Sequence, residues 1–189
     1  MTVGASSACF FPLETEKALD GVLRLGFDKA EVFFNTSSEL EEPFVKELKR
    51  NADEHGARIL SVHPFSSSLE SNCIFAEYKR RFDDFIGLYQ KHFHAAAVLG
   101  ADVVVIHGSV AKQKRDLSDE FYFDRFQKLI DLGKREGVRV CQENVVRFRS
   151  ENVEFLKKMR SALGDNFNMV FDVKQAIRSG YDPFYVLNE

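Results

Sequence analysis

Ionisable side chains stand at the ends of apolar runs of the sequence. Four of them, each closing a run rich in Val, Ile or Phe, are His63, His107, Glu143 and Asp172. A fifth, Glu31, lies inside a similar run at 30–34. Removing a carboxylate or an imidazole from water costs several kcal/mol unless a metal ion, an opposite charge or a hydrogen bond compensates. One such residue would be an accident, whereas four in equivalent positions predict a site.

Carboxylates and imidazoles at one edge of a sheet could hold a divalent metal ion. A Glu and an Asp on adjacent strands repel each other unless a cation or a shared proton lies between them. Carboxylate oxygens suit Mn²⁺, Mg²⁺ or Co²⁺, and additional imidazoles favour Zn²⁺. Such an ion polarises a carbonyl and hydroxyl pair, which assists proton or hydride shifts at sugar carbons. The alternative is that these carboxylates cap helix N-termini or pair with Lys and Arg.

The elements that must position these residues follow a regular alternation. Short apolar runs alternate with amphipathic stretches, which is typical of successive βα units around a parallel sheet. Strands are expected at 7–11, 30–34, 59–64, 102–108, 138–144 and 168–173, and helices at about 14–25, 43–55, 75–99, 119–136, 151–163 and 174–180. Because parallel strands build their sites at their carboxyl ends, the ionisable residues are expected to meet at one rim.

Six βα units fit either an open doubly wound sheet or part of a (βα)8 barrel. The glycine-rich phosphate turn of a dinucleotide-binding fold is absent after the first strand, and neither nucleotide-binding glycine motif occurs in the sequence. A flavodoxin-like topology stays open on this reasoning. No linker divides the chain, so a single domain over residues 1–189 is expected.

Charge and cysteine usage limit the partners and the compartment. The formal net charge is −3, so there is no basic field to attract nucleic acid or an anionic membrane. The three cysteines (Cys9, Cys73 and Cys141) are far apart and form no CxxC pair, which favours a reduced, cytoplasmic protein. No apolar run is long enough to predict a membrane span.

Several segments in order resemble one family. The run 18–32 (ALDGVLRLGFDKAEV) is similar to the opening of the xylose-isomerase-like TIM-barrel superfamily. The segments SVHP at 61–64, VIHG at 105–108, QEN at 142–144 and FDVKQA at 171–176 resemble its strands three to six. The superfamily includes sugar-phosphate isomerases and epimerases, ketose 3-epimerases and type-2 apurinic-site endonucleases. The resemblance implies a TIM-barrel-like parallel (βα) array.

The resemblance also implies roles for individual residues. Glu143 and Asp172 match the first two metal ligands of the superfamily. His63 and His107 match positions that bind extra metal in the endonucleases and contact substrate in the isomerases, so His63, His107 and Glu143 are the catalytic candidates.

Two further residues are candidates for substrate binding. Glu31 belongs to the same polar rim, and Lys174, just after the sixth strand, could meet a phosphate or carboxylate of the substrate. The basic run 112–115 is expected to be a solvated loop, with a phosphate-binding loop as the alternative.

Two residues depart from the family pattern. Gln175 stands where the endonucleases and many epimerases have a His three residues after the Asp, which disfavours a trinuclear zinc site. Arg149 stands where some ketose epimerases carry a second functional carboxylate, which disfavours those epimerases.

The length suggests an incomplete barrel. A complete barrel takes about 250 residues, whereas this chain has 189 and ends after the sixth unit. The expected structure is open, with six of eight units and without the last His and Glu ligands of the family. It would bind a divalent ion weakly, and its open edges would favour self-association.

The function expected from these features is a metal-dependent isomerase or epimerase of a sugar or sugar phosphate. An apurinic-site endonuclease relative and a non-catalytic binding fragment of the same fold are the alternatives. Whether the chain is an active enzyme is left open by the sequence.

Overall fold

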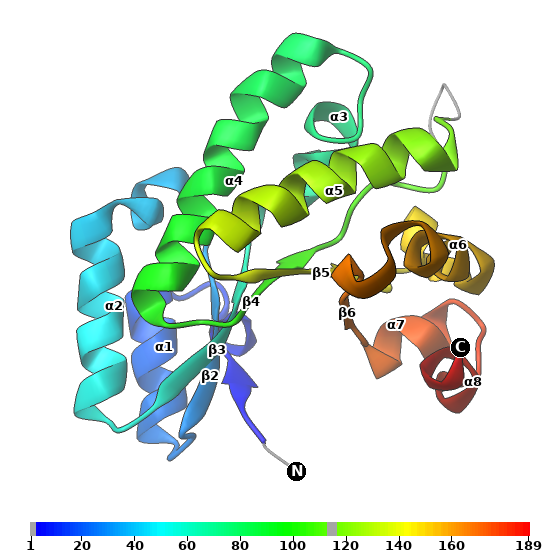
Figure 1. Cartoon of the computed structure of the whole chain (residues 1–189). Helices are drawn as coiled ribbons and strands as arrows, with labels where there is room; N and C mark the ends of the chain where they lie inside the picture. The colour runs from blue at the N-terminus through cyan, green and yellow to red at the C-terminus, as the bar shows by residue number, and fades with distance from the viewer. Residues whose placement is uncertain (1–2, 113–116) are drawn as a thin grey trace. The chain divides into compact units, whose positions relative to one another are not determined.

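The computed structural model describes residues 3–112 and 117–189 and confirms an α/β fold of the TIM-barrel type (Figure 1). Its strands run parallel and lie in chain order in a six-stranded sheet. A complete barrel of this type has eight strands, so the described residues form an incomplete barrel. The strands are β1 Ala5–Ser6, β2 Lys29–Phe33, β3 Arg58–His63, β4 Val103–Ile106, β5 Arg139–Glu143 and β6 Met169–Val170.

Helices follow the strands in close agreement with the predicted ranges. Two short helices, α3 and α8, were not predicted. The α-helices are α1 Thr15–Arg24, α2 Glu42–Glu54, α3 Glu70–Cys73, α4 Lys79–Leu99, α5 Asp119–Arg135, α6 Val153–Leu163, α7 Val173–Arg178 and α8 Pro183–Asn188. The described 3-10 helices are η1 Ser7–Phe10, η2 Ser37–Leu40, η3 Phe65–Leu69, η4 Arg149–Glu151 and η5 Gly164–Asn166.

The first strand ends earlier than its apolar run predicts. Ser6 Oγ accepts a hydrogen bond from Ala8 N at 3.2 Å and thereby caps the 3-10 helix η1. The next hydroxyl, Ser7 Oγ, accepts from Phe33 N at 2.9 Å and ties η1 to the end of β2. Two serine side chains therefore replace the strand pairing expected over 7–11.

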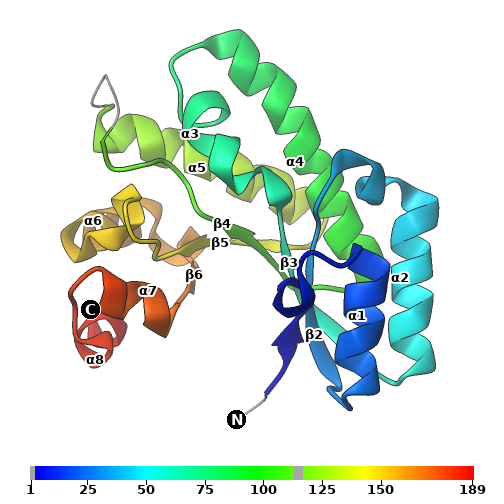
Figure 2. The same ribbon diagram turned by 180° about the vertical axis from the view of Figure 1, so that it is seen from behind.

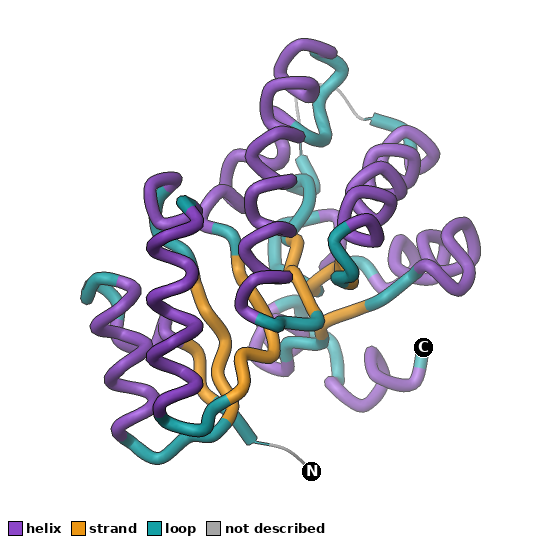
Figure 3. Tube along the Cα trace, turned by 60° about the vertical axis from the view of Figure 1, so that its left-hand side comes forward, coloured by secondary structure: helices purple, strands orange, loops and turns teal. Residues whose placement is uncertain are grey.

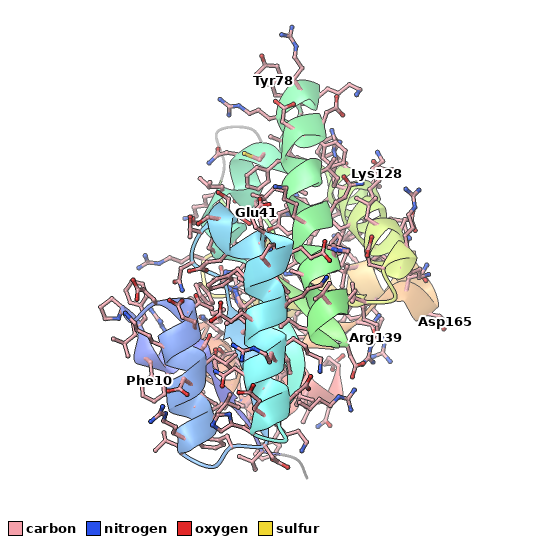
Figure 4. The ribbon with its side chains drawn as sticks, turned by 90° about the vertical axis from the view of Figure 1, so that its left-hand side faces the viewer. Phe10, Glu41, Tyr78, Lys128, Arg139 and Asp165 are labelled. Atoms are coloured by element: carbon pink, nitrogen blue, oxygen red, sulfur yellow. The ribbon has the colours of Figure 1, made fainter. Side chains whose placement is uncertain are left out.

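One of two compact units comprises Met1–Phe65, Leu88–Val104 and Gly133–Arg139. Its strands β1, β2 and β3 pair side by side, with Ser6 opposite Glu31 and Glu31 opposite Ser61. Helices of this unit run beside the strands (Figure 3), and α1 lies alongside α2. The salt bridge of Lys91 Nζ to Glu41 Oε1 (3.1 Å) joins α4 to the start of α2, and Figure 4 labels Glu41 at that point.

The other unit comprises Ser66–Gly87, Val105–Leu132 and Val140–Glu189. Aromatic side chains fill its interior: Tyr122 stacks on Phe75 with ring centroids 4.0 Å apart, and the Tyr122 and Phe155 rings meet at 82°. Helices α6, α7 and α8 lie close together around β6 (Figure 2). That all 189 residues form one domain stays a prediction.

None of the described helices could cross a membrane. The longest, α4, is 21 residues long but carries charged side chains in its first turns.

A histidine without hydrogen-bond partners is buried in the first unit. His92 on α4 is 0 % exposed, and neither ring nitrogen has a partner among the described residues. The rings of Phe34, Phe65 and Tyr89 surround it at centroid distances of 6.0, 5.7 and 5.7 Å. Burial, and secondarily the charge of His63, lower the pKa of His92 from 6.5 to about 3.

We predict that His92 makes the protein lose stability in mild acid. Because its pKa is about 3 when folded and 6.5 when unfolded, the unfolded chain binds the extra proton. The linkage costs about 2 kcal/mol of unfolding free energy between pH 7 and pH 5. In urea titrations at both pH values, His92→Leu should flatten this dependence, while the exposed control His94→Gln should keep it. An unchanged pH dependence in His92→Leu would contradict the prediction.

Candidate functional site

An imidazole and a carboxylate meet at the carboxyl ends of β4 and β5. His107 is the first residue after β4, and Glu143 is the last residue of β5. His107 Nε2 lies 2.9 Å from Glu143 Oε2. Glu143 is buried and His107 is partly buried, so little water screens the pair. Both are residues for which the sequence predicts a site role, and the structure brings them into contact.

Backbone hydrogen bonds join the loops that follow His107 and Glu143 in the chain. Val110 and Phe148 form an antiparallel bridge, and Ala111 N donates to Arg147 O at 2.8 Å. The rings of Phe148 and His107 meet at an interplanar angle of 75°, with centroids 5.7 Å apart. The bridge therefore places an aromatic ring against the imidazole and limits the rotation of that imidazole.

Gln142, next to Glu143, supports the site from within the sheet. It is 0 % exposed, and its Nε2 lies 2.9 Å from both His107 O and Glu143 O. Tyr122 donates its hydroxyl to Gln142 Oε1 at 2.6 Å. Sequence reasoning missed Gln142 and Tyr122, although a polar amide inside an otherwise apolar strand was the available signal.

Asp172 caps a helix. Its Oδ1 accepts from Gln175 N at 2.9 Å, which makes it the N-cap of α7. Asn144 holds the Asp172 backbone by two hydrogen bonds, donating from Nδ2 to Asp172 O (2.9 Å) and accepting from Asp172 N (2.7 Å). The capping alternative considered from the sequence is thus present, and its metal role stays a prediction.

Glu31 has both carboxylate oxygens hydrogen-bonded. Ser6 Oγ donates to Oε1 at 2.9 Å and Ser61 Oγ donates to Oε2 at 2.8 Å, so the side chain links β1, β2 and β3. These two hydroxyls explain how the strand accommodates a carboxylate. Substrate binding by Glu31 stays a prediction.

His63 and Lys174 occupy different surroundings. His63 is the last residue of β3, its ring stacks on Phe33 with centroids 4.9 Å apart, and its Nδ1 lies 3.2 Å from Pro64 O. A proton on Nδ1 would leave the metal-binding lone pair on Nε2. Lys174 is exposed on α7.

Gln175 and Arg149, the two residues that depart from the family pattern, bond to the loops around the site. Gln175 Oε1 accepts from Val146 N at 3.3 Å. Arg149 donates to Leu117 O at 2.8 Å and pairs with Asp119, and its guanidinium lies over the Tyr122 and Phe155 rings. Residues 113–115 of the basic run 112–115 lie outside the described residues.

Comparison with solved structures finds the same fold. A D-tagatose 3-epimerase-like protein matches with a TM-score of 0.82 and 18% identity over 100% of this chain and 70% of its own. A 3-keto-D-glucoside 4-epimerase from E. coli matches with a TM-score of 0.79 and 15% identity over 100% of this chain and 74% of its own. A probable 3-DHS dehydratase from Bacillus anthracis matches with a TM-score of 0.73 and 13% identity over 100% and 69%.

Comparison with curated sequences finds an uncharacterised protein of Mycobacterium leprae, which is 26% identical over 151 residues. The match covers 79% of this chain and 48% of the relative, so the chain spans about half the length of the curated relative. The model of the family described as xylose isomerase-like TIM barrel matches residues 19–187. The chain therefore belongs to the xylose isomerase-like TIM barrel family.

Proposed function

We propose that this protein is a divalent-metal-dependent isomerase or epimerase of a sugar or sugar phosphate. The observation that carries the proposal is the contact of His107 Nε2 with Glu143 Oε2 (2.9 Å) at the ends of neighbouring strands. Solved structures of this fold include sugar epimerases, which supports the substrate class. An ion held there would act as a Lewis acid on a substrate carbonyl and hydroxyl.

The donor chemistry of the site fits a divalent ion. An imidazole and a carboxylate, from His107 just after β4 and Glu143 at the end of β5, each offer one ligand atom. Asp172 would add a second carboxylate through Oδ2, because only its Oδ1 accepts the cap hydrogen bond. Carboxylates with imidazoles suit Mn²⁺, Co²⁺ or Zn²⁺.

The side chains of the site would also handle protons. Glu143 is buried, so its carboxylate acts on a nearby C–H or O–H with little competition from water. Before an ion binds, His107 can donate from Nε2 to the Glu143 carboxylate, and an ion bound by both side chains would replace that proton. A sugar whose hydroxyls approach Glu143 would find a proton acceptor there.

Lys174 and Glu31 are the residues proposed to recognise the rest of the substrate. Lys174 is exposed at the start of α7 and could contact a phosphate or carboxylate of the sugar. Each carboxylate oxygen of Glu31 already accepts a hydrogen bond from a serine hydroxyl, so a sugar hydroxyl would have to share one of these oxygens. We therefore assign Lys174 the larger contribution to affinity for an anionic substrate.

An apurinic-site endonuclease is the second candidate, because an imidazole beside a carboxylate also suits zinc. The net charge of −3 and the use of Gln175 as a loop support favour the sugar enzyme.

Glu143→Gln tests the proposed function directly. The protein, supplied with Mn²⁺ or Co²⁺, is incubated with D-tagatose and with D-fructose, and the epimers are separated by chromatography. Loss of the carboxylate should lower turnover by on the order of 100-fold or more, because metal ligand and proton acceptor are removed together. The control Glu47→Gln, on the exposed side of α2, should match the wild type. Turnover that survives in Glu143→Gln would contradict the proposal.

Asp172→Asn separates capping from metal binding. Asn is as good an N-cap as Asp, so the thermal midpoint should hold while affinity for Co²⁺ falls about tenfold or more. The exposed control Asp165→Asn should change neither quantity. Equal Co²⁺ affinity in Asp172→Asn and wild type would remove Asp172 from the ligands.

The number of ions bound per chain distinguishes the three functional classes. Elemental analysis by mass spectrometry should find about one divalent ion per chain for the sugar enzyme, since the described residues hold one carboxylate–imidazole group of this kind. Two or three zinc ions would instead favour the endonuclease. No ion, together with no turnover, would favour a non-catalytic fragment.

A further inference from the structure

The peptide bond between His107 and Gly108 is held at both of its polar atoms. Its carbonyl oxygen, on His107, accepts from Gln142 Nε2 at 2.9 Å. Its amide, on Gly108, donates to Glu70 Oε2. Both Gln142 and Glu70 are 0 % exposed. We infer that Glu70 and Gln142 are positioning residues for the His107–Glu143 pair, an inference that rests on the proposed function.

The residue after His107 makes such a clamp necessary. Gly108 has φ +86°, and a Cβ built on it would overlap the Tyr122 hydroxyl, so no other residue fits there. Glycine is also the residue with the greatest backbone freedom. A metal ligand followed directly by glycine would therefore be loosely oriented unless its peptide were fixed from outside. Glu70 and Gln142 supply that fixation.

The amide of Gln142 fixes both members of the pair at once. In addition to His107 O, its Nε2 lies 2.9 Å from Glu143 O and 3.2 Å from Ile106 O. Tyr122 donates to its Oε1, which sets which end of the amide faces the carbonyls. The backbones of His107 and Glu143 are thus connected through a single side chain, and their relative placement depends on it.

Glu70 fixes the segment after β4 from the other side. It begins α3, and the next residue, Ser71, accepts from Val110 N at 2.8 Å through its Oγ. Two successive side chains of α3 therefore hold two backbone amides just beyond His107. Burial and, secondarily, the charge of Glu70 raise the pKa of Tyr122 well above its usual value, which keeps the hydroxyl protonated as the donor to Gln142.

Three variants test the positioning role, with Co²⁺ as the probe. Glu70→Ala removes the acceptor of the Gly108 amide, whereas Glu70→Gln keeps an acceptor oxygen without the charge. Tyr122→Phe removes the donor that orients Gln142 and retains the ring. Affinity and the visible absorption spectrum of bound Co²⁺ are measured, with thermal unfolding as the check on folding.

Glu70→Ala should weaken Co²⁺ binding by about 10- to 100-fold and alter the absorption spectrum, as is usual when a residue supporting a ligand is lost. Tyr122→Phe should shift both quantities in the same direction. Glu70→Gln should restore most of the affinity, and the control Glu47→Gln should behave as the wild type. Should Glu70→Ala fail to fold, Tyr122→Phe decides the question.

The metal-free protein provides a readout that does not depend on the proposed function. The ¹H–¹³C NMR signals of the His107 ring should move in folded Glu70→Ala and Tyr122→Phe and stay in place in Glu47→Gln. Wild-type Co²⁺ binding together with unmoved ring signals in these folded variants would overturn the inference, and so would equal losses in Glu70→Ala and Glu70→Gln. If the wild type bound no Co²⁺, the proposed function would fail, while the ring signals would still decide the positioning role.

Discussion

The Glu143 carboxylate that contacts His107 is buried at the end of β5, where the regular hydrogen bonding of the strands stops. Strands β4 and β5 stop at Ile106 and Glu143, so the carbonyls just beyond them lose their ladder partners. A buried carbonyl without a partner costs free energy comparable to a lost hydrogen bond. Gln142 meets this cost with one amide, and the same amide fixes the backbone of both site residues. The same Gln142 side chain therefore orders the two site residues and provides hydrogen-bond partners for the carbonyls at the end of the sheet.

The side-chain amide of Asn144 has an equivalent role between β5 and β6. Asn144 forms a pair of hydrogen bonds with the backbone of Asp172 and so continues the pairing of β5 with β6 beyond the last ladder residues. Asp172 then begins α7 as its N-cap. The QEN segment thus alternates roles along the chain: Gln142 and Asn144 secure the backbone, and Glu143 between them faces the histidine. A strand-end site needs such neighbours because it lies where regular pairing has stopped.

The sequence predicts the positions of β2 to β5 and of the main helices, because apolar runs and helical periodicity are local signals. It also predicts that Glu143 and His107 belong together, since parallel strands end at the same edge. Glu70 could not be predicted, because its partner is a backbone amide 38 residues away and no side-chain pattern marks it. The early end of β1 could not be predicted for a related reason. The hydroxyls of Ser6 and Ser7 bond to backbone amides and so compete with strand pairing, and a hydrophobic pattern carries no sign of such bonds.

Asp172 and Arg149 show why the fold alone does not decide the chemistry. The fold occurs in epimerases and in a dehydratase, so activity must be argued from side chains. A carboxylate at a strand end that also opens a helix is typical of both a ligand and a cap, and the hydrogen bond from Gln175 N shows the cap in Asp172. Arg149, by contrast, is bound to Leu117 O and Asp119 and packed on two aromatic rings, which commits it to the loop. The Glu143 carboxylate, in turn, lies against His107, and the Gln142 amide lies 2.9 Å from the backbone carbonyls of both residues.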